Sequence, residues 1–146
     1  MKASVADLVR AMESIAPLRH AASWDNVGLL LGDPERRLDS LLLAIDLTRS
    51  VAEEACAAGA GAVVAYHPPI FRPRKSLTTA DPQGRALLSL ASAGVAVHSP
   101  HTALDAAPGG LADWLVDGLG DGATAPIEPA DDRPAGEAVK IVTMVP

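Results

Sequence analysis

Six residues suited to metal or acid–base chemistry follow three short apolar segments of this sequence. The segments are SLLLAI (40–45), GAVVA (61–65) and VAV (95–97), and the residues after them are Asp46, Tyr66, His67, His98, His101 and Asp105. Neutral imidazole nitrogens and carboxylates are natural ligands of divalent transition ions such as Zn, Mn or Fe, and a carboxylate can bridge two of them. If the segments are neighbouring strands, these residues form a candidate metal site.

Each of these residues also has a purely structural interpretation. A lone histidine or aspartate at a strand end more often satisfies a backbone hydrogen bond than binds a metal ion. Grouping on adjacent strand ends strengthens the metal interpretation of the set without deciding it, so both interpretations stay open. Pro68 and Pro69 favour a ligand role for His67, because they restrict the backbone directly after it and lower the entropy lost in holding it.

Helices are expected before and between the apolar segments. Ser4 can cap a helix over residues 5–15, where apolar residues recur at helical spacing. The pattern Ser50-x-x-Glu53 predicts a capped helix over residues 48–56. Further helices are predicted over residues 82–94 and 109–120.

Strand-length apolar runs at 40–46, 61–67 and 95–101 alternate with these helices. Such alternation predicts βαβ units with right-handed crossovers. The predicted fold class is therefore α/β, a mainly parallel sheet with helices on both faces in three layers. Ligands bind to such sheets beyond the carboxyl ends of the strands, which is where the polar residues lie.

The last part of the chain differs in composition from the rest. Residues 120–136 are rich in Gly, Pro, Asp and Ala, as a linker is, and AVKIVTMVP (138–146) resembles a strand. We expect an α/β domain over residues 1–120 that carries half of a metal site. Residues 121–146 are expected to form a linker and then either an edge strand or the first strand of a second half.

Composition and charge exclude several classes of protein. A net charge of −6 gives no basic surface for nucleic acid, and Arg72, Arg74 and Lys75 form only a short local patch. Aromatic residues are only 3% of the chain, too few for a single-stranded nucleic-acid groove. Cys56 is the only cysteine, which excludes an intrachain disulfide and a cysteine metal cage. The N-terminus lacks the apolar run of a signal peptide or membrane span, so we expect a cytoplasmic protein with no membrane partner.

Two other stretches are weaker candidates for function. Trp24, Asp25 and Asn26 form a polar turn that either holds an aromatic plug or lines the cleft. The PGG stretch at 108–110 could cradle an anion with its backbone N–H groups at a helix start. Neither GxxxxGK[ST] nor GxGxxG occurs, so a nucleotide-binding phosphate loop is not supported.

Three stretches together resemble one known family: WDNVGLLLG (24–32), YHPPIFRP (66–73) and SPHTALDAAPGG (99–110). The family is that of the NGG-interacting-factor-three-like, dinuclear-metal-centre hexameric proteins, some of which are described as GTP cyclohydrolase I type 2. The order and spacing of the stretches are similar over residues 1 to about 120, the N-terminal half of the family. Tyr66 makes the second stretch resemble the animal and plant branch.

The resemblance implies roles for four residues. His67 and Asp105 take the positions of metal ligands, and Tyr66 stands where the first of two adjacent histidines is usual, which supports one metal ion better than two. Tyr66 would then direct its hydroxyl at a substrate or a bound water. His101 would orient Asp105 or act as a substrate-facing acid/base group.

The family's remaining ligands belong to a C-terminal His-x-x-x-Glu motif, and no such pair occurs in this sequence. Two protein ligands are fewer than the three or four of a tight site. We therefore expect an N-terminal fragment of a longer protein; weak or lost metal binding, or completion of the site by a neighbouring subunit, are the alternatives.

The function implied by the resemblance is that of a metal-dependent hydrolase, with nucleotide or phosphate-containing small molecules as the suggested substrates. The alternative is a non-catalytic metal-binding scaffold or regulatory interaction protein. In either case the resemblance implies a homo-oligomer, a hexamer in the full-length family.

Overall fold

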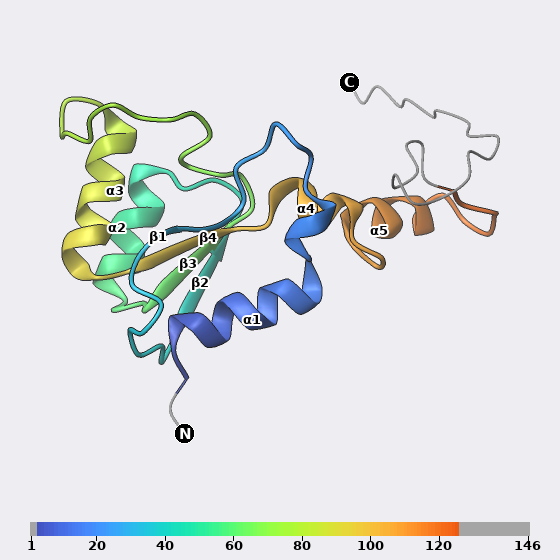
Figure 1. Ribbon diagram of the computed structural model, residues 1–146, viewed down its shortest axis with the longest axis horizontal. Coiled ribbons are helices and arrows are strands. Elements are labelled where there is room, and N and C mark those ends of the chain that lie inside the picture. The colour runs from blue at the N-terminus through green and yellow to red at the C-terminus, as the bar shows by residue number, and fades with distance from the viewer. Residues whose placement is uncertain (1–2, 126–146) are drawn as a thin grey trace.

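The computed structural model describes residues 3–125 of the 146-residue chain (Figure 1). In this part, strands and helices alternate from β2 to β4, which confirms the predicted α/β class. The elements are α1 (Val5–Ile15), the short 3₁₀ helix η1 (Leu18–His20), β1 (Gly28–Leu31), β2 (Leu41–Ala44), α2 (Arg49–Ala57), β3 (Ala62–Ala65), α3 (Pro82–Ala93), β4 (Ala96–Ser99), α4 (His101–Ala106) and α5 (Leu111–Asp117).

The strands form one sheet in the order β1-β4-β3-β2. Strands β2, β3 and β4 run parallel, and helices α2 and α3 make the two crossovers that parallel neighbours require. Strand β1, which is not among the predicted strands, pairs antiparallel with β4. The described sheet is therefore mainly parallel, as predicted, with an antiparallel edge.

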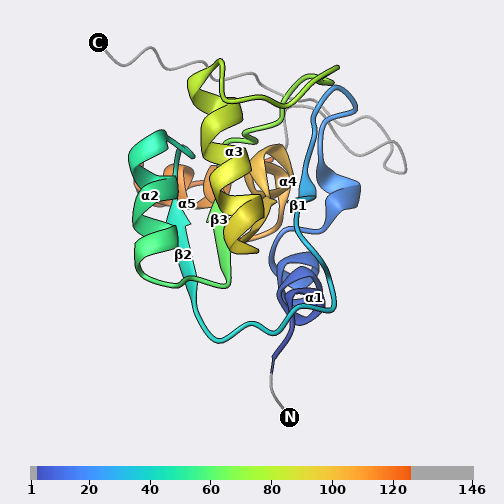
Figure 2. The same cartoon turned by 90° about the vertical axis from the view of Figure 1, so that its left-hand side faces the viewer.

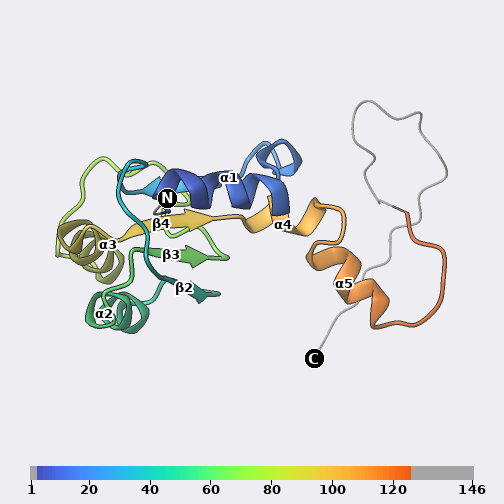
Figure 3. The same ribbon diagram turned by 90° about the horizontal axis from the view of Figure 1, so that it is seen from below.

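Helices cover both faces of the sheet, as predicted, in three layers (Figure 3). Val63 and Val97 lie in one buried cluster with residues of α2 and α3, two helices that lie side by side (Figure 2). Val64 and Ala96 lie in a second cluster with Val5 of α1. Successive residues of a strand point to opposite faces, so β3 and β4 contribute to both clusters.

The helix starts follow from short polar side chains. The Ser4 hydroxyl accepts a hydrogen bond from the Asp7 N–H at 3.3 Å, which confirms the predicted cap of α1. The predicted capping pattern at Ser50 is wrong, because α2 is capped by Thr48, whose hydroxyl accepts from the Val51 N–H at 3.3 Å. Thr48 has the extended backbone that a capping residue needs, whereas Ser50 already lies inside the helix.

Two short helices follow β4. Helix α4 is not among the predicted elements, and the helix predicted over residues 109–120 is confirmed in the shorter form of α5. The strand expected at 138–146 lies outside the described residues, and the domain boundary at residue 120 stays a prediction. Within residues 3–125, no helix is both long and apolar enough to cross a membrane.

Candidate functional site

Backbone hydrogen bonds extend the pairing of β2 and β3 past the ends of both strands. The Tyr66 N–H donates to the Ala44 carbonyl and the His67 N–H donates to the Ile45 carbonyl, each at 2.9 Å. This pairing brings His67 beside Asp46, and the His67 Nδ1 lies 2.8 Å from the Asp46 Oδ1. Both side chains are about half exposed, at 49% and 63%.

The loop before β1 supplies a second carboxylate to the same edge of the sheet. The His101 Nδ1 lies 2.9 Å from each carboxylate oxygen of Asp25. Thr102 donates to Asp25 through its backbone N–H, at 3.2 Å, and through its hydroxyl. The Asp25 side chain is completely buried and that of His101 is only 18% exposed. The first turn of α4 is therefore held to the 21–27 loop by one buried carboxylate.

Asp25 is held as a carboxylate by its hydrogen bonds. Burial favours the neutral acid, but bonds from the Thr102 hydroxyl, His101 and the Asn26 N–H outweigh burial and hold the pKa of Asp25 below its usual value. An ionised carboxylate only accepts hydrogen bonds, so the His101 Nδ1 carries the donated proton. His101 also has a φ of 31°, in the left-handed region that non-glycine residues rarely adopt.

The two histidines therefore share one pattern. In each, a carboxylate holds Nδ1, which leaves Nε2 as the nitrogen that can bind a metal ion or move a proton. Their ring centroids are 5.5 Å apart. Carboxylate-held imidazoles of this kind are typical of metal ligands and of general bases.

Tyr66 occupies the space between the histidines and Asp105. Its hydroxyl donates to the Asp105 Oδ1 at 2.5 Å, and its ring lies 4.8 Å from that of His67 and 5.5 Å from that of His101. Burial, together with the Asp105 carboxylate, raises the pKa of Tyr66 to about 12. Tyr66 is thus a neutral donor at ordinary pH, and one oxygen of Asp105 is already engaged.

The structure thus brings together all four residues predicted for the site. His67, Asp105 and His101 have the donor chemistry of a transition-metal site, and their partners hold them in place. Within the described residues, however, no group of three or more His, Cys, Asp or Glu side chains converges closely enough to hold an ion. The half metal site therefore stays a prediction.

His98 is not part of the site, although the sequence analysis groups it with His67 and His101. It lies on β4 opposite Leu29 and Val64 and is only 2% exposed. Two residues after Ala96, it faces α1 rather than the carboxyl edge of the sheet. Burial lowers the pKa of His98, and its Nδ1 has no hydrogen-bond partner among the described residues.

Asp25 is the site residue that the sequence indicates least. The Trp24–Asn26 turn lines the site, as the functional interpretation of that stretch expects. The Asn26 side-chain amide donates to the Ile70 carbonyl. In the sequence, Asp25 is indicated only by its position between Trp24 and Asn26 in a polar turn. At the PGG stretch, the Gly109 N–H donates to the Asp113 carboxylate at 2.6 Å, so the anion cradle expected there is satisfied by the chain itself.

The comparisons with known proteins identify the family. Residues 3–145 match the model of Duf34/NIF3 (NGG1p interacting factor 3). The chain belongs to this family, which confirms the resemblance of its three motifs.

Its relatives are longer proteins. The chain is 52% identical over 118 residues to "Protein NIF3 homolog" of Schizosaccharomyces pombe, covering 79% of this chain and 42% of that protein. It is 40% identical over 114 residues to "GTP cyclohydrolase 1 type 2 homolog" of Clostridium perfringens, covering 78% and 44%. The solved structure of a Bacillus cereus protein related to NIF3 matches with a TM-score of 0.81 at 30% identity, covering 88% of this chain and 36% of that one. The chain thus spans less than half the length of these three proteins.

Proposed function

We propose that this chain carries part of the catalytic centre of a metal-dependent hydrolase. The observation that carries the proposal is the pair of imidazoles whose Nδ1 atoms are each held by a carboxylate, on the edge of the sheet where α/β proteins bind ligands. The name of the clostridial relative, a GTP cyclohydrolase homolog, supports a nucleotide or phosphate-containing substrate. A divalent Zn, Mn or Fe ion, when bound, would lower the pKa of a coordinated water.

His67 and Asp105 are the proposed metal ligands. The contact of His67 with Asp46 fixes the orientation of the ring and leaves Nε2 for the ion. Tyr66 orients Asp105 through one carboxylate oxygen and leaves the other for the ion. The ligands still needed for a tight site would come from elsewhere in a longer protein or from a second copy in a homo-oligomer.

His101 is the proposed proton-transfer residue. Its partner Asp25 is buried and ionised, so it holds the Nδ1 proton and stabilises the imidazolium that forms when Nε2 takes a proton. Asp46, the partner of His67, is exposed and screened by water, so it would stabilise an imidazolium less well than Asp25 does. The rare backbone conformation at His101 is also typical of functional positions.

Metal analysis of the purified protein tests the ligand assignment. We expect the Zn, Mn and Fe content to fall to background in His67→Ala and in Asp105→Ala. The control is His98→Leu, which removes an imidazole outside the site and should keep the metal. Unchanged metal content in both site variants would overturn the assignment.

The second candidate is a non-catalytic metal-binding scaffold or regulatory interaction protein. The name "NGG1-interacting factor 3" of a Saccharomyces cerevisiae relative, 37% identical over 151 residues, favours it. A turnover screen over nucleotides with added Zn, Mn or Fe separates the two functions. Activity that His101→Ala abolishes without loss of metal supports the hydrolase; metal binding with no turnover of any nucleotide supports the scaffold.

A further inference from the structure

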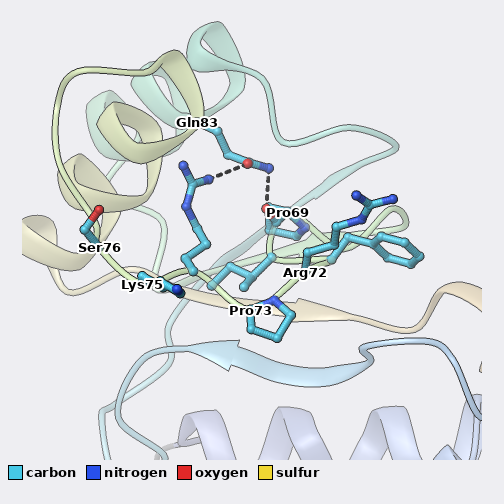
Figure 4. A pocket seen from close by; sticks show the side chains of 9 residues that line it. Pro69, Arg72, Pro73, Lys75, Ser76 and Gln83 are labelled. Carbon is cyan, nitrogen blue, oxygen red and sulfur yellow. Dashed lines mark hydrogen bonds between the residues drawn. The ribbon is translucent and has the colours of Figure 1, made fainter.

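A basic cavity lies directly beside the proposed metal centre. It has a volume of about 490 Å³ and lies between the 69–76 loop and the start of α3 (Figure 4). Three of the chain's 12 basic residues line it, and no acidic side chain does. They are Arg72, Arg74 and Lys75, and they stand out on a chain of net charge −6.

The loop that forms the cavity is fastened to α3. Arg74 donates to the Gln83 side chain at 2.6 Å and to Asp81 at 2.8 Å. The Gln83 amide donates to the Pro69 carbonyl (Figure 4). At Gly84 a Cβ atom would lie 2.2 Å from the Thr78 carbonyl oxygen, so the loop approaches the helix as closely as only glycine allows. The cavity is therefore built by specific contacts.

The charges of Arg72 and Lys75 take no part in the contacts that hold this loop to α3. Arg74 is neutralised by Asp81, whereas neither Arg72 nor Lys75 forms an ion pair within residues 3–125. Both side chains line the cavity and are exposed. Figure 4 shows Arg72 and Lys75 at opposite ends of the cavity, so they can approach a bound oxyanion such as a phosphate group from two sides.

An aromatic surface connects the cavity to His101. Phe71 lines the cavity, and its ring lies 6.5 Å from the His101 ring and 6.1 Å from the Trp24 ring. The centroid of the Trp24 ring lies 6.3 Å from that of His101, so the three rings form one cluster. Trp24 is 63% exposed and Phe71 44%, so both offer ring surface to a ligand. Exposed rings beside a polar site are suited to stacking a planar heterocycle.

We propose that this cavity is the phosphate subsite of the same centre, and that the heterocycle of a phosphorylated ligand lies against Trp24 and Phe71. Arg72 and Lys75 would bind the phosphate, and the bond to be hydrolysed would then lie on the ring side, next to His101. The inference rests on the proposed function for the reaction but not for binding, because neither cation belongs to the metal site.

Binding of guanosine monophosphate to the whole chain, stripped of metal with EDTA, tests the phosphate subsite. By calorimetry at low salt, we expect Arg72→Gln and Lys75→Gln each to weaken binding about tenfold, the equivalent of one charge-assisted hydrogen bond. The matched control is Arg49→Gln, which removes the same charge on α2, where it pairs with Glu53. Equal losses in Arg49→Gln and Arg72→Gln, or no loss in Arg72→Gln and Lys75→Gln, would overturn the subsite.

A second comparison tests the aromatic surface and separates the two proposals. Trp24→Ala should weaken guanosine monophosphate binding and leave ribose 5-phosphate binding unchanged; equal effects on both would overturn the stacking role. His67→Ala should bind guanosine monophosphate as the wild type does in EDTA. If His67→Ala and Asp105→Ala keep the metal content of the wild type while Arg72→Gln and Lys75→Gln weaken binding, the metal centre is refuted and the subsite stands. If the site variants lose metal but Arg72→Gln and Lys75→Gln bind guanosine monophosphate normally, the subsite is refuted and the metal centre stands.

Discussion

The His101 Nδ1 lies 2.9 Å from both carboxylate oxygens of Asp25, although 76 positions separate the two residues in the sequence. This contact joins the loop before β1 to the helix after β4. It needs the antiparallel pairing of those two strands, which places Gly28 opposite Ser99. The stability of the site should therefore depend strongly on Asp25.

Asp25→Asn should lower the free energy of unfolding by about 2 kcal/mol, because charge-assisted hydrogen bonds from Thr102 and His101 are lost inside the protein. Urea denaturation at neutral pH measures the change. In Asp46→Asn, which alters an exposed pair, the loss should be below about 1 kcal/mol. Equal losses in the two variants would contradict the buried role of Asp25.

The stability of the protein should also fall in acid through Asp25. Its folded-state pKa is lower than its unfolded value, so its contribution is present above the unfolded pKa and is lost as the pH falls through the folded one. Denaturation curves below pH of about 4 should show a shallower decline for Asp25→Asn than for the wild type. Parallel declines would contradict the lowered pKa.

Protonation of His98 should cause a second loss of stability in acid, at a higher pH than the loss caused by Asp25. Burial lowers the pKa of His98 although Glu13 opposes it, so below about pH 6.5 the unfolded chain binds a proton that the folded protein excludes. Stability therefore rises with pH across this range. His98→Leu, which keeps an apolar side chain in the core, should reduce the rise of stability with pH between about 5 and 7; the same slope as in the wild type would contradict the prediction.

Tyr66 can be titrated directly, because it is the only tyrosine in the sequence. The ultraviolet absorbance of tyrosinate should rise with a pKa of about 12 in the folded protein and with the ordinary value of about 10 in guanidinium. Asp105→Asn should lower the folded-state value, because it removes the negative charge beside the hydroxyl. A folded-state value equal to the unfolded one would show that Tyr66 does not contact Asp105.

Gly84→Ala should destabilise the protein by about 1 to 3 kcal/mol, although alanine is normally favoured in helices, because the new methyl group would meet the Thr78 carbonyl at 2.2 Å. Thermal denaturation measures the loss. Gly122→Ala, where nothing lies within 4 Å of the added atom, should change stability by less than about 0.5 kcal/mol. If Gly84→Ala leaves the stability unchanged, the backbone at Thr78 moves aside at no cost in free energy and the prediction is wrong.

Local pattern was enough to predict most of the secondary structure. Helical spacing and Ser4 predict α1, and Pro82 and Gly94 bound α3 correctly. Helix α4 escaped prediction because six residues are too few to establish a helical period. Strand β1 escaped because it precedes β2 with no helix between them and so lies outside the alternation that predicts the other strands. The cap of α2 was misplaced by two positions, since Thr48 and Ser50 are both good capping residues and only backbone conformation separates them.

The sequence by itself determined the α/β class, the family motifs and the chemical types of Tyr66, His67, His101 and Asp105. These follow from residue identity and short-range spacing, which are local properties. Tertiary structure alone decided that Asp25 holds His101, that Tyr66 holds Asp105 and that His98 faces α1. Such contacts depend on strand order and on the direction of each side chain, and a displacement by one residue in a strand reverses the face that it occupies.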